Sequence, residues 1–220
     1  AISVPKTIDE GLIEQYLSGR GIDFKAVKDY PIVSGHKFYH GHGELPSVGF
    51  VYGDKEAVKW RSIEGKNFTQ DGASRTLPEG AKTLVIVEGE MDLLACASAG
   101  VDCCVSVPNG APIKVSSKAI VQADDTKFNY VWAAKDVIES VDRVILAVDS
   151  DDAGTALAEE LARRIGRAKC WTVKWPADCK DANDVLQKLG SEALSDAIGE
   201  AEAMPLEGVY SADDYALEIS

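Results

Sequence analysis

The chain has 220 residues, and its 45% hydrophobic and 27% charged residues are typical of globular proteins, so we expect one large domain or two small ones. No apolar run approaches membrane-spanning length, and the five cysteines include no C-x-x-C pair, which argues against a membrane protein and a zinc ribbon. The net charge of −13 argues against a simple nucleic-acid binder, because phosphate contacts need Lys and Arg.

Charge and turn-forming residues indicate how the chain divides. Residues 1–80 contain 10 Lys or Arg and 11 Asp or Glu, whereas residues 81–220 contain 13 and 25, so any basic surface is expected mainly in the first part. The stretch Thr76–Lys82, with its Pro and Gly, is the expected boundary. We predict a small α+β N-terminal subdomain over 1–80, a catalytic α/β domain over 81–190, and a C-terminal helix and linker over 191–220.

The first elements are expected to be structural. Thr7–Gly19 has one apolar face, with Thr7 as N-cap and Glu10 completing a capping box, and predicts a helix. A second short helical piece is expected from Gly21 to Val27. His36–Gly43 holds all three histidines, but only one carboxylate lies nearby, so we favour a loop over a metal site.

A basic strand follows. Alternating apolar residues predict a hairpin over Ser47–Ile63, and on its return strand Lys59 and Arg61 share one face. Lys66 and Asn67 come shortly after. These side chains form either a solvated sheet face or a cluster that binds a triphosphate or a single-stranded template. The pattern alone does not separate the two.

Two apolar runs then end in carboxylates. Two stretches, Thr83–Leu94 and Val144–Gly154, each begin with a run that predicts a strand buried on both faces. Glu88 follows the first strand, and Asp149 and Asp151 follow the second. Ligands bind at the carboxyl ends of parallel strands, where these carboxylates could not all stay ionised without a cation. The cluster therefore predicts a site for a hard divalent cation. A helix N-cap is the alternative for the Asp-x-Asp pair.

The remaining elements alternate between strand and helix. We predict helices over Met91–Ala99, Tyr130–Ser140, Thr155–Ile165 and Ser191–Ala201, and strands over Asp102–Val107 and Lys169–Trp175. Asn109 and Gly110 form a turn, and Ala111–Lys127 is expected to be an insertion or a mobile loop. In a third acidic turn, Asp181 is the candidate metal ligand and Asp184 the candidate N-cap. The five thiols are expected to be reduced and buried, in a cytoplasmic protein.

These motifs together resemble the TOPRIM domain shared by topoisomerases, primases and some nucleases. The resemblance rests on five motifs, namely Val58–Arg61, Gly65–Phe68, Glu88–Asp92, Asp149–Gly154 and Lys180–Asp184. In particular, the chain resembles the primase region of phage helicase-primases and of Twinkle-like proteins, from about Val48 to Leu189. The implied fold is α/β, a TOPRIM Rossmann-like parallel sheet flanked by helices with a small α+β N-terminal subdomain.

The resemblance implies a DNA primase, a DNA-directed RNA polymerase that makes short RNA primers on single-stranded DNA during replication. It implies two Mg²⁺ or Mn²⁺ ions held by Glu88, Asp149, Asp151 and Asp181, with Glu88 either as ligand or as base for the attacking 3′-hydroxyl. The implied partners are the DNA template, ribonucleoside triphosphates and a replicative helicase on the same or a separate chain, and no membrane.

The resemblance also implies the groups that hold the nucleotide and the template. Lys59, Arg61 and Lys66 would neutralise the incoming triphosphate, and so count among the expected catalytic residues. The further contact candidates are Asn67, Gly89, Asp92 and Asn109.

Several alternatives stay open. The chain has no G-x-x-x-x-G-K-[ST] motif and no preceding zinc module, so a primase core or a trimmed relative in a bacterial or phage-infected cell is expected rather than a helicase motor. A TOPRIM nuclease would use the same carboxylates, and the basic cluster favours polymerisation over it. A non-catalytic DNA-binding or assembly domain is disfavoured by the retained acidic set. A phosphatase or response-regulator-like domain ranks last, because a response regulator lacks the Glu-Gly-Glu strand end.

Overall fold

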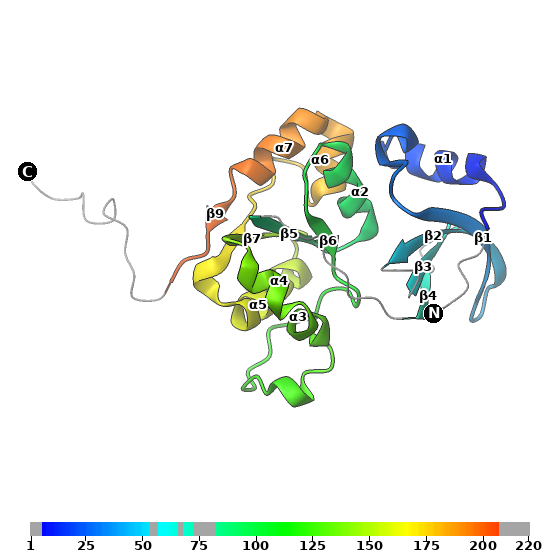
Figure 1. The fold of residues 1–220 in the computed structure, drawn as a ribbon. Coiled ribbons are helices and arrows are strands. Elements are labelled where there is room, and N and C mark those ends of the chain that lie inside the picture. Colours follow the sequence, from blue (N-terminus) through cyan, green and yellow to red (C-terminus); the bar gives the residue numbers. More distant parts are fainter. Residues whose placement is uncertain (1–5, 53–56, 66–67, 73–81, 207–220) are drawn as a thin grey trace, which may run out of the picture.

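The computed structural model contains two β-sheets with helices packed around them (Figure 1). It describes residues 6–52, 57–65, 68–72 and 82–206, and the account below concerns these. The strands are β1 (Ile32–Tyr39), β2 (Gly43–Tyr52), β3 (Ala57–Ser62), β4 (Phe68–Gly72), β5 (Thr83–Val87), β6 (Cys104–Ser106), β7 (Arg143–Ala147), β8 (Cys170–Thr172) and β9 (Glu202–Ala203). The helices are α1 (Glu10–Ser18), α2 (Glu90–Ser98), α3 (Asn129–Ala133), α4 (Lys135–Ser140), α5 (Asp152–Ile165), α6 (Ala182–Leu189) and α7 (Ser191–Gly199), with short 3₁₀ turns η1 (Phe24–Val27), η2 (Gln122–Asp124) and η3 (Arg167–Lys169).

The first sheet is antiparallel, with its strands in the order β1-β2-β3-β4. As the hairpin pattern predicts, Val58 and Trp60 of β3 are buried while Lys59 and Arg61 lie on the opposite face. Trp60 fits closely against β2 because Gly49 has no side chain: a Cβ there would lie 2.8 Å from the indole ring. Close packing on one face therefore fixes the direction of the basic side chains on the other.

Helix α1 lies against this sheet, and its N-cap differs from the prediction. The cap is Asp9, whose carboxylate accepts from the backbone N–H of Leu12 at 3.3 Å, so the assignment of Thr7 is wrong. Asp9 is also held by tertiary contacts: its N–H donates to Ser34 Oγ at 2.8 Å, and Ser34 Oγ donates to the Asp9 carbonyl at 2.7 Å. These contacts from β1 select the residue at which the helix begins.

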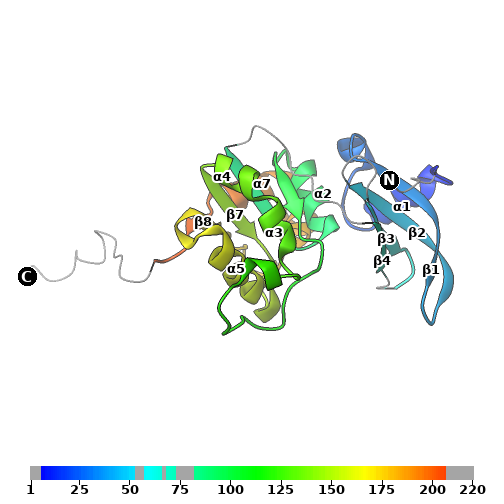
Figure 2. The same cartoon turned by 60° about the horizontal axis from the view of Figure 1, so that its bottom comes forward.

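The second sheet has the order β6-β5-β7-β8-β9, parallel except for β9. Helices α2, α6 and α7 cover one face, and α3, α4 and α5 cover the other (Figures 1 and 2). Alternate residues of β5 enter the two cores, with Val85 and Val87 in one and Leu84 and Ile86 in the other. The α/β class with a parallel sheet flanked by helices is thus confirmed.

The two sheets share a hydrophobic core. Ile13 and Leu17 of α1 and Phe50 of β2 belong to the same buried cluster as Val85 and Leu94. The predicted boundary at Thr76–Lys82 lies, apart from its last residue, outside the described residues.

Several predicted elements differ in extent. His36–Tyr39 complete β1 and Gly43 begins β2, so only residues 40–42 of the predicted His36–Gly43 loop form a turn. The predicted helix Tyr130–Ser140 is split into α3 and α4. The segment Ala111–Lys127 contains only the short η2 turn. All five cysteines are free, and four of them are buried while Cys103 is half-buried. No helix in the described part of the chain is both long and apolar enough to cross a membrane.

Candidate functional site: an acidic sheet edge beside a basic strand

The acidic residues after β5 and β7 leave the sheet at the same edge. Val87 pairs with Ala147 in the parallel β5–β7 ladder, so Glu88, directly after β5, and Asp149, two residues after β7, emerge beside each other. This is the edge at which an open α/β sheet binds its ligands. The predicted meeting of the two strand ends is therefore present.

Glu88 and Asp149 are carboxylates that resist ionisation. Burial, followed by the charge of Asp151, raises the pKa of Glu88, although the Ala111 N–H bonds to its carboxylate. Burial, then Glu88 and Asp181, raises the pKa of Asp149 to about 6. Each carboxylate thus opposes ionisation of its neighbour, and a cation placed among them would relieve the repulsion.

Asp151 and Asp181 also serve as helix N-caps. Asp151 Oδ1 accepts from the Gly154 N–H at 2.8 Å at the start of α5, which bears out the N-cap reading of the Asp-x-Asp pair. Asp181 Oδ1 accepts from the Asp184 N–H at 2.7 Å and caps α6, so the assignment of Asp184 as N-cap is wrong. Each cap occupies Oδ1 and leaves Oδ2 for another partner.

Lys180 lies among these carboxylates. Its Nζ is 3.0 Å from Asp181 Oδ2 and 3.8 Å from Asp149 Oδ2. Its carbonyl accepts from the Ser150 N–H at 2.8 Å, which joins the turn after β7 to the turn before α6. The ammonium group supplies positive charge at the cluster.

The donor set fits a divalent cation in its chemistry. Glu88 Oε2 is buried and has no hydrogen-bond partner, as expected of an oxygen that is free to become a ligand. Within the described residues, no three His, Cys, Asp or Glu side chains are already gathered closely enough to hold an ion. Ion binding would therefore require Glu88, Asp149 and the Oδ2 atoms of Asp151 and Asp181 to turn towards a shared point, and Asp181 Oδ2 would have to leave the Lys180 ammonium.

The basic side chains of β3 reach the start of α2, next to the acidic edge. Lys59 Nζ donates to Glu90 Oε1 and to the Val107 carbonyl, the latter at 3.2 Å. Arg61 lies 3.5 Å from Glu90 Oε2. Lys66 and Asn67 lie outside the described residues. The sequence did not single out Glu90 as the partner of these cations.

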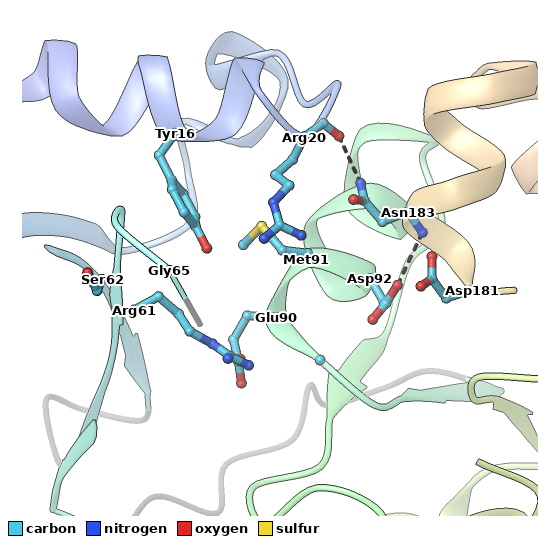
Figure 3. Close-up of a pocket in the computed structure, with 11 residues that line it drawn as sticks. Tyr16, Arg20, Arg61, Ser62, Gly65, Glu90, Met91, Asp92, Asp181 and Asn183 are labelled. Carbon is cyan, nitrogen blue, oxygen red and sulfur yellow. Dashed lines mark hydrogen bonds and ion pairs between the residues drawn. The ribbon is translucent and has the colours of Figure 1, made fainter. Parts of the chain in front are cut away.

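A pocket of about 240 Å³ opens between α1, β3, α2 and α6 (Figure 3). It is lined by Tyr16, Arg20, Arg61, Ser62, Gly65, Gly89, Glu90, Met91, Asp92, Asp181 and Asn183. It brings together Arg61, Gly89, Asp92 and Asp181 from the predicted set. Tyr16 and Arg20 were missed because α1 shows only an amphipathic pattern.

Two of the predicted contact residues, Asp92 and Asn109, also make structural contacts. Asp92 is buried, and burial followed by the charge of Asp181 raises its pKa to about 7. Asn109 Nδ2 donates to the Lys127 carbonyl at 3.1 Å, closing the segment between them.

Comparison with known proteins identifies the domain that carries this site. Residues 85–186 match the family model described as Toprim-like. The chain contains a Toprim-like domain. Its matched span runs from β5 to α6 and includes Glu88, Asp149, Asp151 and Asp181.

Two curated relatives come from Arabidopsis thaliana. The "Twinkle homolog protein, chloroplastic/mitochondrial" is 38% identical over 222 residues, covering 94% of this chain and 30% of that protein. The "Primase homolog protein" is 43% identical over 174 residues, covering 72% of this chain and 51% of that protein. The chain thus spans about half or less of the length of these relatives. Their plant origin does not agree with the expected bacterial or phage-infected cell.

Solved structures with the same fold are primases. The primase fragment of the bacteriophage T7 primase-helicase has a TM-score of 0.62 at 23% identity, over 82% of this chain and 72% of that one. The RNA polymerase domain of Mycobacterium tuberculosis primase DnaG has a TM-score of 0.58 at 16% identity, over 88% and 77%. These identities establish the fold alone. Together with the relatives, the Toprim-like domain supports a primase-related function.

Proposed function

We propose that this chain is a primase core, which makes short RNA primers on single-stranded DNA by metal-dependent nucleotidyl transfer. The observation that carries the proposal is the position of Lys59 and Arg61 of β3 at the start of α2, beside the sheet edge that holds Glu88 and Asp149. Phosphoryl transfer needs both charges at one place: carboxylates that hold metal ions, and basic side chains that neutralise the triphosphate.

In this proposal Glu88, Asp149, Asp151 and Asp181 hold Mg²⁺ or Mn²⁺, as two ions. Bound ions would supply positive charge to the attacking and leaving oxygens. Glu88 is either a ligand or the base that takes the proton from the primer 3′-hydroxyl, a role for which a raised pKa is suited.

The basic side chains orient the substrate. Lys59, Arg61 and Lys66 neutralise the triphosphate of the incoming ribonucleotide, and Asn67, Gly89, Asp92 and Asn109 are further proposed contacts for nucleotide or template. Because Arg61 presents a planar fork of donors, it suits a phosphate better than a point charge does.

The proposed setting includes a helicase and an organelle. One structural neighbour is a fragment of a primase-helicase, which supports a replicative helicase as partner, on the same chain or another. The name of the Arabidopsis Twinkle homolog favours a chloroplast or mitochondrion over a bacterial or phage-infected cell.

The test is extension of a short RNA primer annealed to single-stranded DNA, with labelled ribonucleotides and Mg²⁺. Asp149→Asn should abolish template-dependent extension, and Glu139→Gln, on an exposed surface of α4, is the matched control and should keep the wild-type rate. Degradation of the DNA would instead identify a nuclease. Absence of both reactions, with Mg²⁺ still raising the melting temperature, would contradict catalysis and identify a non-catalytic metal-binding relative.

A further inference from the structure

We infer that Glu90 is a positioning residue, which holds Lys59 and Arg61 in place and reduces their combined charge. This inference rests on the proposed function, because it concerns the same cations and the same triphosphate. Glu90 does not touch the proposed substrate in this role; it acts through the two basic side chains.

The Glu90 side chain, in the first turn of α2, is buried and contacts residues of β3 and of the end of β6. Its side chain is 1% exposed, against 15% for Lys59 and 37% for Arg61. Besides the two cations of β3, Ser106 Oγ at the end of β6 donates to Glu90 Oε1 at 3.3 Å. Lys59 also bonds to the carbonyl of the next residue, Val107, at 3.2 Å. Two groups of the Toprim-like domain, the Glu90 carboxylate and the Val107 carbonyl, thus hold the Lys59 ammonium in place.

The buried carboxylate of Glu90 is stabilised by the positive charge around it. A buried charge is costly unless it is paired, and Glu90 has two cationic partners. It also lies in the first turn of α2, where the helix dipole favours negative charge. The ion pair with this carboxylate therefore restricts the Lys59 side chain, which is 15% exposed, more than that of Arg61, which is 37% exposed.

The pairing has two opposite consequences for a triphosphate. Placement of the two cations favours the transition state, where geometry matters most. Partial neutralisation weakens the attraction to the ground-state triphosphate, because one carboxylate lies against two cations. Glu90 is therefore expected to raise kcat while also raising KM for the nucleotide.

The decisive variant is Glu90→Gln, which keeps the shape of the side chain and its acceptor oxygen but removes the charge. Binding of a non-hydrolysable ribonucleoside triphosphate with Mg²⁺ is measured by calorimetry at two salt concentrations. Primer extension gives kcat and KM for the same protein. We expect the Kd for the triphosphate to fall about threefold, with a steeper salt dependence, because the loss of one negative charge leaves more of the positive charge of Lys59 and Arg61 uncompensated. We expect kcat to fall about tenfold.

Controls separate positioning from general damage. Glu139→Gln removes an equivalent charge from an exposed ion pair on α4 and should leave Kd and kcat unchanged. Glu90→Asp keeps the charge on a shorter side chain, so it should have the wild-type Kd but a kcat as low as that of Glu90→Gln. Tighter binding in Glu90→Gln with lower kcat supports the inference. Unchanged Kd and kcat, or weaker binding together with lower kcat, overturns it.

The binding measurement stands apart from the proposed reaction. If the wild-type protein extends no primer, primer synthesis is contradicted, but tighter triphosphate binding by Glu90→Gln would still support the inference that Glu90 reduces the combined charge of Lys59 and Arg61. If the wild-type protein extends primers and Glu90→Gln does so at the wild-type rate and KM, primer synthesis stands and the inference about Glu90 is overturned.

Discussion

The carboxylate of Asp92 accepts a hydrogen bond from the backbone N–H of Asn183 at 3.1 Å, although the two residues lie 91 positions apart. The Asn183 side chain in turn donates to the Arg20 carbonyl at 2.9 Å. These bonds join the first turns of α2 and α6 to the segment after α1 (Figure 3). One side of the pocket is therefore held by a carboxylate that burial disfavours when ionised.

Two substitutions of Asp92 distinguish the effect of its charge on stability from the effect of its hydrogen bond. Asp92→Asn keeps an acceptor for the Asn183 N–H and removes a buried charge, so at pH 8 without metal we expect the free energy of unfolding to rise by on the order of 1 kcal/mol. Asp92→Leu leaves that N–H without an acceptor and should cost about 1–3 kcal/mol. Urea unfolding measures both. Equal destabilisation by the two variants would contradict this assignment.

The acidic edge predicts a specific pH dependence. The pKa of Asp149 is raised to about 6, that of Asp92 to about 7, and that of Glu88 is raised as well, so the folded protein binds protons more tightly than the unfolded chain does. In EDTA the contribution of these groups to stability should therefore fall as pH rises from about 4 to about 7. Added Mn²⁺ must displace the same protons, so its apparent affinity should rise over the same range.

Melting temperatures between pH 5 and pH 8, with EDTA and with Mn²⁺, check this dependence. In Asp149→Asn, the melting temperature in EDTA should decrease less as the pH rises, and Mn²⁺ should raise the melting temperature less than it does in the wild-type protein. A wild-type melting temperature that changes with pH just as the variant does would show that Asp149 does not titrate in this range.

Gly154 is a position where any side chain is excluded. A Cβ on it would lie well inside contact distance of the Asp149 backbone, closer than real Cβ atoms approach. Gly154→Ala should therefore displace the turn that carries Asp149 and Asp151, cost on the order of 3 kcal/mol, and weaken Mn²⁺ binding. Gly199→Ala is the control, because a Cβ at that helical position would meet nothing within 4 Å. Thermal unfolding of both variants gives the comparison.

Arg164 holds the long segment before α3 against α5. It bonds to Asp125 and Glu160, and its guanidinium lies 3.8 Å above the centre of the Phe128 ring. The bond from Arg164 lowers the pKa of Asp125. Arg164→Met would remove the cationic partner of Asp125 and leave buried Glu160 with Arg163 as its remaining cation at 3.0 Å, and should cost about 3 kcal/mol.

The consequence should extend along the chain. Glu160 also accepts from the Ser116 N–H, so hydrogen exchange around Ser116 should accelerate in Arg164→Met. Lys135→Met, which removes an exposed ion pair on α4, should change neither stability nor exchange by a measurable amount. Unchanged exchange at Ser116 would show that this segment is held by other contacts.

The parts of the site that lie along single strands were predictable. Uninterrupted apolar runs before Glu88 and Asp149 place both residues at strand ends, and alternation within β3 places Lys59 and Arg61 on one face. In these cases a local period determines the direction of the side chain.

Contacts between distant segments were not predictable in this way. Glu90 and Lys59 lie 31 residues apart, and nothing in the local pattern of either residue indicates the other. Tyr16 of α1 and Arg20 just after it reach the pocket because α1 shares a hydrophobic core with α2.

The two wrong N-caps have a related cause. Thr7 and Asp9 are both good capping residues, and the bonds from Ser34 to Asp9 decide between them. Asp181 and Asp184 lie one turn apart, and the extended backbone of Asp181, with φ −151° and ψ 174°, makes it the residue before the helix. Residue type alone leaves both choices open.

The strand order of the two sheets has a consequence for synthesis of the chain. Strands β1 to β4 pair in consecutive order, whereas β5 pairs with β7 across helices α2, α3 and α4, strand β6 and the segment around η2. Local pairings form faster than distant ones, and emerging chains fold from the N-terminus. The basic strand should thus be assembled while the Toprim-like domain is still emerging, with Ile13, Leu17 and Phe50 exposed until Val85 and Leu94 cover them. During that interval the nascent chain presents apolar surface and is a natural client for chaperones.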